Sequence, residues 1–212
     1  MPKILPNQTD LYALTDSRLS LGRPLKYVAE SLLGAGIKIL QYREKKLPAG
    51  KMLEECHMLR ELTNEYGACF IVNDHIDIAM LAGADGVHIG QDDLPVDEVR
   101  KLVGEDMIIG LSTHSPAQAR RAIELGADYI GVGPIFATRT KEDVVDPVGL
   151  EYLDYVSREI NIPYVAIGGI KAHNIREVAK HGGYCAALVS ELVGAEDIGG
   201  KAMELRELLR TV

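Results

Sequence analysis

Short runs of apolar residues recur eight times along the chain and are separated by longer, more polar stretches. The runs occupy residues 11–14, 37–40, 69–72, 86–89, 107–111, 129–132, 164–167 and 185–189. Most of their positions are apolar, which is typical of strands that are buried on both faces in a parallel sheet. We therefore predict eight short parallel strands.

The stretches between most of these runs have the apolar spacing of amphipathic helices. Leu59 and Leu62 illustrate this spacing within residues 51–66, where it places apolar side chains on one helical face. The phrase Gly-Ala-Asp occurs at 83–85 and again at 126–128, each time just before a predicted strand. Because glycine readily adopts the left-handed conformation that ends a helix, these glycines indicate where two of the helices stop.

The alternation of strands and helices along the whole chain indicates a closed barrel. Divided among eight units, the 212 residues give about 26 residues per unit, which is the size of one strand and one helix. An open sheet is expected to carry a Gly-x-Gly-x-x-Gly turn after its first strand, and no such turn follows Leu14. We predict a single α/β domain over residues 1–212 with the (β/α)8 fold, a TIM barrel.

Composition and charge narrow the classes of function. Hydrophobic residues make up 47% of the chain and charged residues 25%, which suits a folded soluble domain. The formal net charge of -8 and the absence of tryptophan argue against a broad nucleic-acid-binding surface. No apolar run is long enough for a membrane helix, and Cys56, Cys69 and Cys185 are too far apart for a paired-cysteine metal motif. We expect a cytoplasmic protein with buried free thiols.

Polar residues follow the predicted strands, at the end of the barrel where TIM-barrel enzymes hold their active sites. They are Gln41, Tyr42, Arg43, Glu44 and Lys45 after the second strand, Asn73 and Asp74 after the third, Asp92 and Asp93 after the fourth, Ser112 after the fifth, and Thr138, Arg139, Thr140 and Lys141 after the sixth. Loops are commonly polar without any function. Gln41, Arg43 and Asn73 nevertheless lie directly at strand ends, where a plain turn would use glycine, serine or proline, and so they indicate a ligand site.

Cations and carboxylates in these loops predict a site for a polyanion and a divalent cation. Arg43, Lys45 and Lys141 are expected to converge at one mouth of the barrel, together with Asp74 and Asp93. Oxygen ligands with retained water are what Mg²⁺ uses on diphosphates. Two alternatives stay open. The two acids could simply pair with the neighbouring cations, and Asp92 could bind the metal in place of Asp93.

A second anion site is predicted at the last two loops. Gly169 is the second residue of a Gly-Gly pair after the seventh strand, and Val189 and Ser190 close the eighth. This region of a TIM barrel frequently binds a phosphate through backbone amides. The alternative explanation of the glycine pair is a tight turn that requires positive φ.

The six histidines contain no zinc motif such as His-x-His. His88 lies within an apolar run and is expected inside the barrel. The histidines expected on helices, away from the mouth, are His57, His173 and His181. His75 and His114 follow strands and are the two candidates for proton transfer, although an orienting role is equally compatible with the position of His114.

Seven phrases, taken together, resemble the bacterial thiamine-phosphate synthase family over residues 11–197. They are QYREK at 41–45, IVND at 71–74, GADGVHIGQDDLP at 83–95, GLSTHS at 110–115, GADYIGVGPIFATRTK at 126–141, VAIGGI at 165–170 and LVS at 188–190. The resemblance implies a TIM-barrel transferase that joins hydroxymethylpyrimidine diphosphate to a thiazole phosphate and releases pyrophosphate, with Mg²⁺ as cofactor. It leaves the oligomeric state open, a homo-oligomer included.

The resemblance also implies a role for each matching residue. To the pyrimidine diphosphate it assigns Gln41, Arg43, Lys45, Asn73, Ser112 and Lys141, of which Arg43, Lys45, Ser112 and Lys141 are the implied catalytic residues. Tyr42 and Glu44, within the same phrase, are further implied substrate-binding residues. To Mg²⁺ it assigns Asp74 and Asp93. To the thiazole phosphate it assigns Thr138, Arg139, Thr140, Gly169, Val189 and Ser190.

The chain departs from the family pattern in its last strand, and two other functions stay open. The segment 182–192 reads GGYCAALVSEL, where the family has phrases such as GADGVAVVSAI, and Ala137 stands where proline is frequent. A related thiazole tautomerase would need His114 as proton carrier but not the polyanion-site residues together. A ligand-binding barrel without turnover would bind both substrates and release no pyrophosphate.

Overall fold

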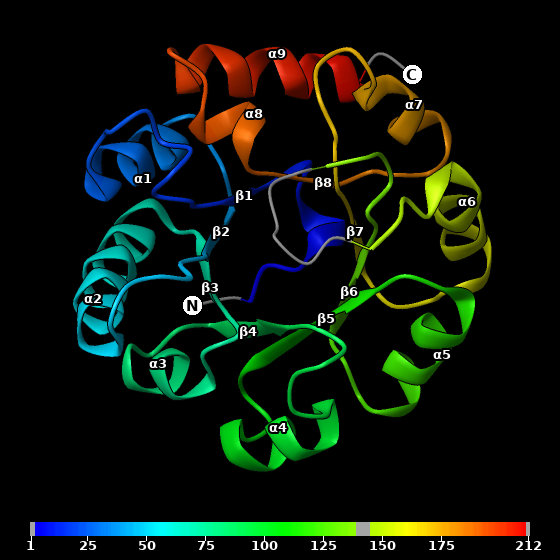
Figure 1. Ribbon diagram of the computed structural model, residues 1–212, viewed down its shortest axis with the longest axis horizontal. Helices are drawn as coiled ribbons and strands as arrows, with labels where there is room; N and C mark the ends of the chain where they lie inside the picture. Colours follow the sequence, from blue (N-terminus) through cyan, green and yellow to red (C-terminus); the bar gives the residue numbers. More distant parts are fainter. Residues whose placement is uncertain (1–2, 139–144, 211–212) are drawn as a thin grey trace.

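Eight parallel strands close into a barrel in sequence order, as predicted (Figure 1). The structure is a computed structural model that describes residues 3–138 and 145–210. The strands are β1 (Leu11–Leu14), β2 (Ile39–Tyr42), β3 (Cys69–Asn73), β4 (Gly86–Ile89), β5 (Ile108–Thr113), β6 (Tyr129–Val132), β7 (Tyr164–Ile167) and β8 (Ala186–Leu188). Because β8 pairs with β1, the sheet has no free edge.

Helices surround the barrel on its outer face (Figure 1). They are α1 (Leu25–Gly34), α2 (Ala49–Tyr66), α3 (Ile76–Leu81), α4 (Val96–Val103), α5 (Pro116–Glu124), α6 (Gly149–Glu159), α7 (Ile175–Lys180), α8 (Ser190–Val193) and α9 (Ile198–Arg210), with the 3-10 turn η1 (Pro6–Gln8) before β1. Helix α9 contacts both α1 and α7 and so completes the ring. Ile4 and Leu5 pack against the apolar residues inside the barrel and cover the amino ends of the strands.

Several strands extend further into polar sequence than the apolar runs predict. Strand β2 covers Ile39–Tyr42 instead of residues 37–40, β3 includes Asn73, and β5 continues to Thr113. The backbone ladder does not depend on an apolar side chain at every position, and Gln41 still pairs with Ile71 of the next strand. Gln41, Tyr42, Asn73 and Ser112, which were expected just after the strands, therefore belong to the strands themselves, and this fixes the direction in which their side chains point.

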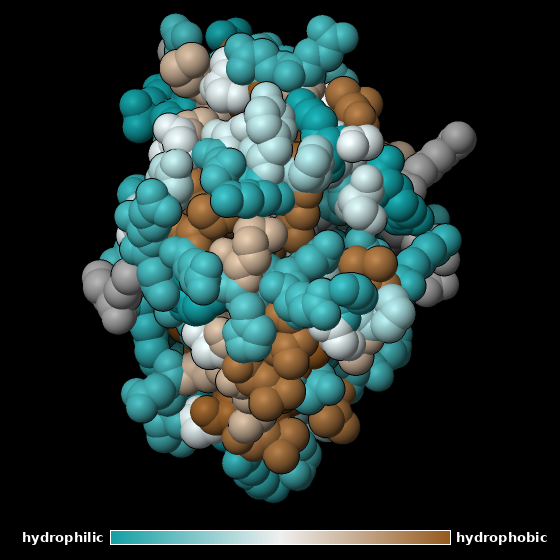
Figure 2. Space-filling model, turned by 90° about the vertical axis from the view of Figure 1, so that its left-hand side faces the viewer, coloured by the Kyte–Doolittle hydropathy of each residue, from teal (hydrophilic) through white to brown (hydrophobic). Residues whose placement is uncertain are grey.

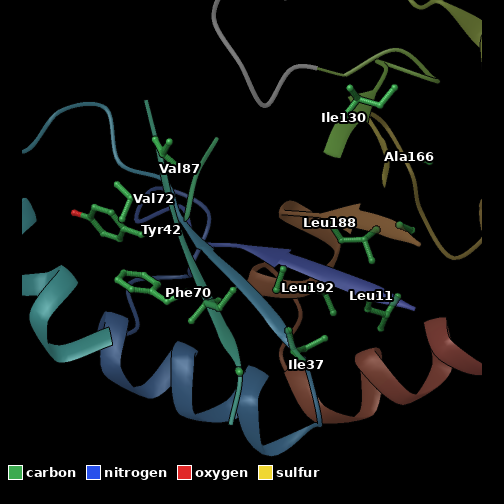
Figure 3. Packing of buried hydrophobic residues seen from close by; sticks show 14 of the residues in the cluster. Leu11, Ile37, Tyr42, Phe70, Val72, Val87, Ile130, Ala166, Leu188 and Leu192 are labelled. Carbon is green, nitrogen blue, oxygen red and sulfur yellow. The ribbon is translucent and has the colours of Figure 1, made fainter. Parts of the chain in front are cut away.

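Side chains alternate between two cores. Tyr12, Ile71 and Tyr129 pack inside the barrel, whereas the larger core lies between the sheet and the helices. Figure 3 shows part of this outer core, with Phe70 and Val72 beside one another on β3. Alternation by one residue thus decides whether a side chain faces the barrel interior or the helices.

The two Gly-Ala-Asp phrases are structural. Gly126 has a φ of 83° just after α5, in agreement with its predicted role at a helix end. The Asp128 carboxylate accepts a hydrogen bond from the backbone N of Ile109 at 2.7 Å, and Arg100 Nη2 lies 2.6 Å from the same oxygen. The phrase at 83–85 repeats this arrangement, because its aspartate likewise accepts from a neighbouring strand and pairs with an arginine. Each phrase ends a helix and ties the next strand to its neighbour.

The face formed by α1, α2 and α3 is largely hydrophilic, with an apolar patch at the level of α3 and α4 (Figure 2). Helices α3 and α4 carry the exposed apolar side chains Met80, Leu81 and Leu102. Within residues 3–138 and 145–210, no helix is both long and apolar enough to cross a membrane. The three cysteines are free and buried as expected, and burial raises the pKa of Cys56 to about 12, which keeps this thiol protonated.

Candidate active site

A cavity of about 720 Å³ opens at the carboxyl ends of the strands. This volume is in the range of small-molecule sites in proteins. The predicted site residues that line it are Arg43, Ser112, Thr138, Gly169, Val189 and Ser190. Because these residues come from both predicted anion sites, the two sites share one cavity.

A second cavity, of about 20 Å³, lies among inward-facing residues of the barrel. Gln41 and Asn73 line it, and Ser112 lines both cavities. Gln41 and Asn73 are buried, with exposed fractions of 2% and 7%. They belong to a group of buried polar side chains at this small cavity, where each polar atom needs a partner.

A buried aspartate holds Arg43 at the cavity wall. Arg43 is 5% exposed and Asp16 is 4% exposed, and Arg43 Nη1 donates to Asp16 Oδ2 at 3.1 Å. The Arg43 backbone N donates to Thr15 Oγ1 at 3.0 Å, which fixes the same strand end. Arg43 Nε is buried without a hydrogen-bond partner in the described part of the chain. An unpaired buried donor is costly, so Arg43 retains a hydrogen-bonding group that the described residues leave unsatisfied.

Asp16 was missed by the sequence reasoning. The signal was present, because Thr15 and Asp16 follow the first apolar run directly, as the other polar residues follow theirs. A carboxylate at that point looks like a site residue in its own right. Its contact with Arg43 shows that its role is to position a cation.

Lys45 and Asp74, which follow β2 and β3, form an ion pair, and neither residue lines the large cavity. The Lys45 side chain is 49% exposed, so water screens the pair and its contribution to stability is small. The sequence left open that the predicted metal ligands pair instead with neighbouring cations. For Asp74 this alternative is confirmed, because its carboxylate pairs with Lys45. A weak pair of this kind can be exchanged for other partners at little cost.

The backbone at Asp74 adopts a conformation that is uncommon for residues other than glycine. Its φ is 63°, and the backbone N of His75 donates to Asn73 O across it at 2.8 Å. Aspartate and asparagine tolerate positive φ better than most residues do. The sharp turn places the Asp74 carboxylate immediately at the end of β3.

Asp93 lies in the loop after β4, the neighbour of β3 in the barrel. One of its carboxylate oxygens accepts a hydrogen bond from the backbone N of Gly90 at 2.6 Å, which shapes this loop. Carboxylates at the ends of two adjacent strands suit Mg²⁺, which takes few protein ligands when it also binds phosphate oxygens and water. Among the described residues no three acidic, histidine or cysteine side chains form a metal site, so a metal held here would need oxygens from a ligand as well.

Glu44 organises the loop that carries Lys45. Its carboxylate accepts from Ser17 Oγ at 2.6 Å and from the backbone N atoms of Lys45 and Lys46 at 2.8 and 3.1 Å. Partial burial acts to raise the pKa of Glu44, but these hydrogen bonds outweigh it and lower the pKa below its ordinary value. The described contacts of Glu44 are thus contacts with its own loop and with Ser17.

The Tyr42 side chain faces away from the cavity, contrary to expectation. Its hydroxyl donates to Glu55 Oε2 on α2 at 2.6 Å, and its ring lies in the outer core beside Val72 (Figure 3). Burial and the nearby Glu55 carboxylate raise the pKa of Tyr42. Because its neighbours Gln41 and Arg43 face inward, the alternation of the strand directs Tyr42 to the helices.

A lysine and a glutamate that were not predicted complete the second anion site. Lys171 Nζ donates to Ser190 Oγ at 2.8 Å and lies 3.1 Å from Glu191 Oε2. Lys171 also lines the large cavity. Burial acts to raise the pKa of Glu191, but the Ala172 amide and Lys171 outweigh it and lower the pKa. Among the described residues, Lys171 therefore brings a positive charge to this site, which the adjacent Glu191 carboxylate partly neutralises.

Glycine is required sterically in this part of the site. Gly169 has a φ of 64°, and a Cβ there would lie 2.6 Å from Ala137 O. The glycine pair was also explicable as a tight turn that requires positive φ, and the structure has this turn. The turn brings the loops after β6 and β7 together at the cavity. Arg139, Thr140 and Lys141 lie outside the described residues.

The histidines near the cavity are His114 and His173. His114 Nδ1 lies 2.5 Å from Gly133 O, and because a carbonyl only accepts, Nδ1 carries a proton and donates to it. The expectation that His173 lies on a helix away from the mouth is wrong, since α7 begins only at Ile175 and the loop before it borders the cavity. His88 is inside the barrel, as predicted.

Comparisons with known proteins agree with this geometry. The family model described as thiamine monophosphate synthase matches residues 11–192. A thiamine-phosphate synthase from Pelotomaculum thermopropionicum is 60% identical over 202 residues, which are 95% of this chain and 93% of that protein. One from Lawsonia intracellularis is 58% identical over 212 residues, which are 99% of this chain and 98% of that protein.

A solved structure supports the same relationship. The thiamine phosphate pyrophosphorylase from Pyrococcus furiosus superimposes with a TM-score of 0.86 at 38% identity, and the match covers 94% of this chain and 95% of that one. The likeness therefore extends from the phrases at the strand ends to the entire barrel. On these grounds the chain belongs to the thiamine monophosphate synthase family.

Proposed function

We propose that this chain is a thiamine-phosphate synthase, which joins hydroxymethylpyrimidine diphosphate to a thiazole phosphate and releases pyrophosphate. The observation that carries the proposal is a single cavity with two separate anion-binding positions. Arg43 provides one of them at the end of β2, and Lys171 with Ser190 provides the other beside β7 and β8. Two phosphorylated substrates that react with each other require such an arrangement.

The reaction breaks one bond and forms one. The carbon–oxygen bond between the pyrimidine methylene and the diphosphate breaks, and its electron pair leaves with the diphosphate. The electron-rich aminopyrimidine stabilises the positive charge that develops on the methylene carbon, and the lone pair of the thiazole nitrogen forms the new carbon–nitrogen bond. The protein has to orient both rings and neutralise the departing charge, so it needs neither a covalent nucleophile nor a proton carrier.

The residues at the cavity have matching roles. Arg43 binds the departing diphosphate, and the inward-facing Gln41 and Ser112 hold the pyrimidine ring. Lys171 and Ser190 bind the phosphate of the thiazole. Lys141, which lies outside the described residues, is expected to add a second cation at the diphosphate.

Asp74 and Asp93 would hold Mg²⁺ at the edge of this site. The metal would supply positive charge against the diphosphate. Binding of the metal by Asp74 would free the Lys45 ammonium, which then becomes available to the same diphosphate. A metal held by the two carboxylates, together with the freed lysine, would thus supply the positive charge that stabilises the leaving group.

The proposal is tested by product analysis. The protein is incubated with both substrates and Mg²⁺, and the expected product has the mass of the two substrates joined with loss of pyrophosphate. A ligand-binding barrel without turnover would bind both substrates and form no such product, and this result would contradict the proposal.

His114→Gln distinguishes the synthase from a tautomerase. The variant keeps a hydrogen-bonding side chain of similar size but removes the imidazole of a residue that lines the cavity. We expect turnover to fall by less than about tenfold, because a proton carrier is worth roughly 10² to 10⁴ in rate and the synthase reaction needs none. A loss of several hundredfold with unchanged substrate binding would make His114 a proton carrier.

Lys171→Met tests the second anion position. We expect KM for the thiazole phosphate to rise by about tenfold or more, because a hydrogen bond to a charged group typically contributes about 1.5 to 3 kcal/mol, while KM for the pyrimidine diphosphate stays unchanged. Lys180→Met is the matched control, since Lys180 pairs with Glu177 on the exposed surface of α7. Equal effects of Lys171→Met on both KM values would show that Lys171 does not bind the thiazole phosphate.

Three further predictions complete the proposal. We place the protein in the cytoplasm, which its buried free cysteines support. One domain over residues 1–212 and assembly into a homo-oligomer stay predictions, and the apolar side chains exposed on α3 and α4 are the first place to look for contacts between copies.

A further inference from the structure

A chain of hydrogen bonds crosses the barrel interior and joins Gln41 to Ser112. Gln41 Nε2 donates to the Tyr12 hydroxyl at 2.7 Å, and that hydroxyl lies 2.8 Å from the hydroxyl of Tyr129. The Tyr129 hydroxyl lies 2.9 Å from His88 Nδ1, and His88 Nε2 lies 3.0 Å from Ser112 Oγ. We refer to these five residues as the interior relay.

The interior relay is shielded from water. Its members face inward from β1, β2, β4, β5 and β6, and each is at most 9% exposed. Burial raises the pKa of Tyr12 and of Tyr129, so both hydroxyls keep their protons. Every donor in the interior relay therefore needs an acceptor within the relay or in the cavity above it.

The hydrogen-bonding capacity of each group gives the interior relay a direction. The Tyr12 hydroxyl accepts from Gln41, and the only acceptor for its own proton among the described residues is Tyr129. The Tyr129 proton then goes to His88 Nδ1. A neutral imidazole has one donor and one acceptor, so His88 Nε2 carries the proton and donates to Ser112.

The two ends of the interior relay are consequently complementary. Gln41 Oε1 is buried and has no hydrogen-bond partner within residues 3–138 and 145–210, and Gln41 borders the small cavity. Ser112 Oγ accepts from His88, which leaves its own proton for an acceptor in the cavity. The interior relay thus presents an acceptor at Gln41 and a donor at Ser112, and reversal of the Gln41 amide would require reversal of every link.

We propose that Tyr12 is a specificity-determining positioning residue, which locks the Gln41 amide with Oε1 toward the substrate so that the site selects an amino-substituted pyrimidine over its oxo counterpart. The inference rests on the proposed function. An amino group donates to Oε1, whereas an oxo group would place a second acceptor against it with no proton between them. Buried polar groups left unpaired in this way are what allows a site to discriminate strongly.

The test compares two substrates, the aminopyrimidine diphosphate and the same diphosphate with an oxo group in place of the amino group. Wild type is expected to prefer the amino substrate in kcat/KM. Tyr12→Phe removes the acceptor for Gln41 Nε2, which frees the amide to turn, and we expect the preference to fall by about fivefold to tenfold, the value of one neutral hydrogen bond. Tyr129→Phe breaks the interior relay one hydrogen bond further from Gln41. This variant takes the place of Tyr12→Phe in the test if Tyr12→Phe does not fold.

Tyr152→Phe is the matched control. The Tyr152 hydroxyl is also buried and donates to Thr113 Oγ1 at 2.7 Å, but it belongs to the outer core and not to the interior relay. Its loss is expected to lower stability and to leave the substrate preference unchanged. If Tyr12→Phe keeps the wild-type preference, or if wild type has none, the inference is overturned while the proposed function stands.

The direction of the interior relay can also be measured without any substrate. In protein labelled with ¹⁵N-histidine, the nitrogen chemical shifts of His88 report which ring nitrogen carries the proton. We expect protonated Nε2 and unprotonated Nδ1. Protonated Nδ1 would mean that the interior relay runs the other way and that Gln41 presents its NH₂ group, which overturns the inference whatever the enzyme's activity.

Discussion

Asp74→Asn is expected to lower kcat by about 10²- to 10³-fold, the range lost when one group that stabilises transition-state charge is removed, and to leave the fold intact. The substitution takes away a charged oxygen ligand for Mg²⁺. It also leaves Lys45 without its ion-pair partner. Asparagine accepts the φ of 63° at this position as readily as aspartate does, so the backbone turn should persist. Steady-state kinetics over a range of Mg²⁺ concentrations, together with thermal unfolding, measure both effects.

Asp77→Asn provides the control for this experiment. Asp77 is exposed in the first turn of α3, three residues further along the chain, and the substitution removes the same charge from the same region. Its turnover should be close to wild type. If Asp74→Asn also turned over normally at limiting Mg²⁺, the assignment of Asp74 as a metal ligand would be wrong.

Arg43→Met is expected to lower kcat to a similar extent, by about 10² to 10³. Arg43 is fixed at the cavity wall by Asp16, so its charge is in place before the diphosphate begins to leave. Such preorganised charge acts more strongly in the transition state than on the bound substrate. The effect should therefore appear in kcat as well as in KM for the pyrimidine diphosphate.

Arg43→Met also leaves a buried carboxylate with fewer partners, which lowers stability. The double variant Arg43→Met with Asp16→Asn separates the two effects, because it also removes the buried carboxylate charge and should recover stability without recovering turnover. Arg18→Met is the matched control, since Arg18 also contacts Asp16, at 3.4 Å, but its side chain is 42% exposed. Recovery of turnover in the double variant would mean that Arg43 acts only through folding.

Much of the fold was predictable because its determinants are local. Eight apolar runs separated by helical stretches specify a closed parallel barrel, and Gly126 ends a helix at the predicted position. The predicted ends of β2 and β5 were wrong because an inward-facing residue at the mouth need not be apolar. Gln41 and Ser112 are strand residues whose polarity reflects the site and not a loop.

The sequence pattern likewise identified some residues of the candidate site and misassigned another. Arg43, Ser112 and Ser190 could be found because polar residues at strand ends converge in any barrel of this kind. Tyr42 is adjacent to them in sequence, but strand alternation turns its side chain to the helices. A motif of consecutive residues does not show which side chains face the barrel interior and which face the helices. That distinction requires the register of the strand.

The remaining features depend on contacts between distant segments. Tyr12 and Tyr129 are 117 residues apart, and neither looks different in the sequence from any other apolar strand residue. Lys171 becomes a site residue only because the barrel brings it to Ser190. These groups could not be identified from local pattern, since it is the closure of the sheet that brings them together.

The proposed reaction in this cavity joins two phosphorylated substrates with loss of pyrophosphate. The most direct test measures pyrophosphate and thiamine phosphate in the same reaction with Mg²⁺, with both substrates and with each omitted in turn. The proposed function predicts equal amounts of the two products when both substrates are present and no pyrophosphate when either is missing. Absence of pyrophosphate, together with hydrogen exchange into the thiazole phosphate alone in deuterated water, would contradict the claim and identify a proton-transfer enzyme instead.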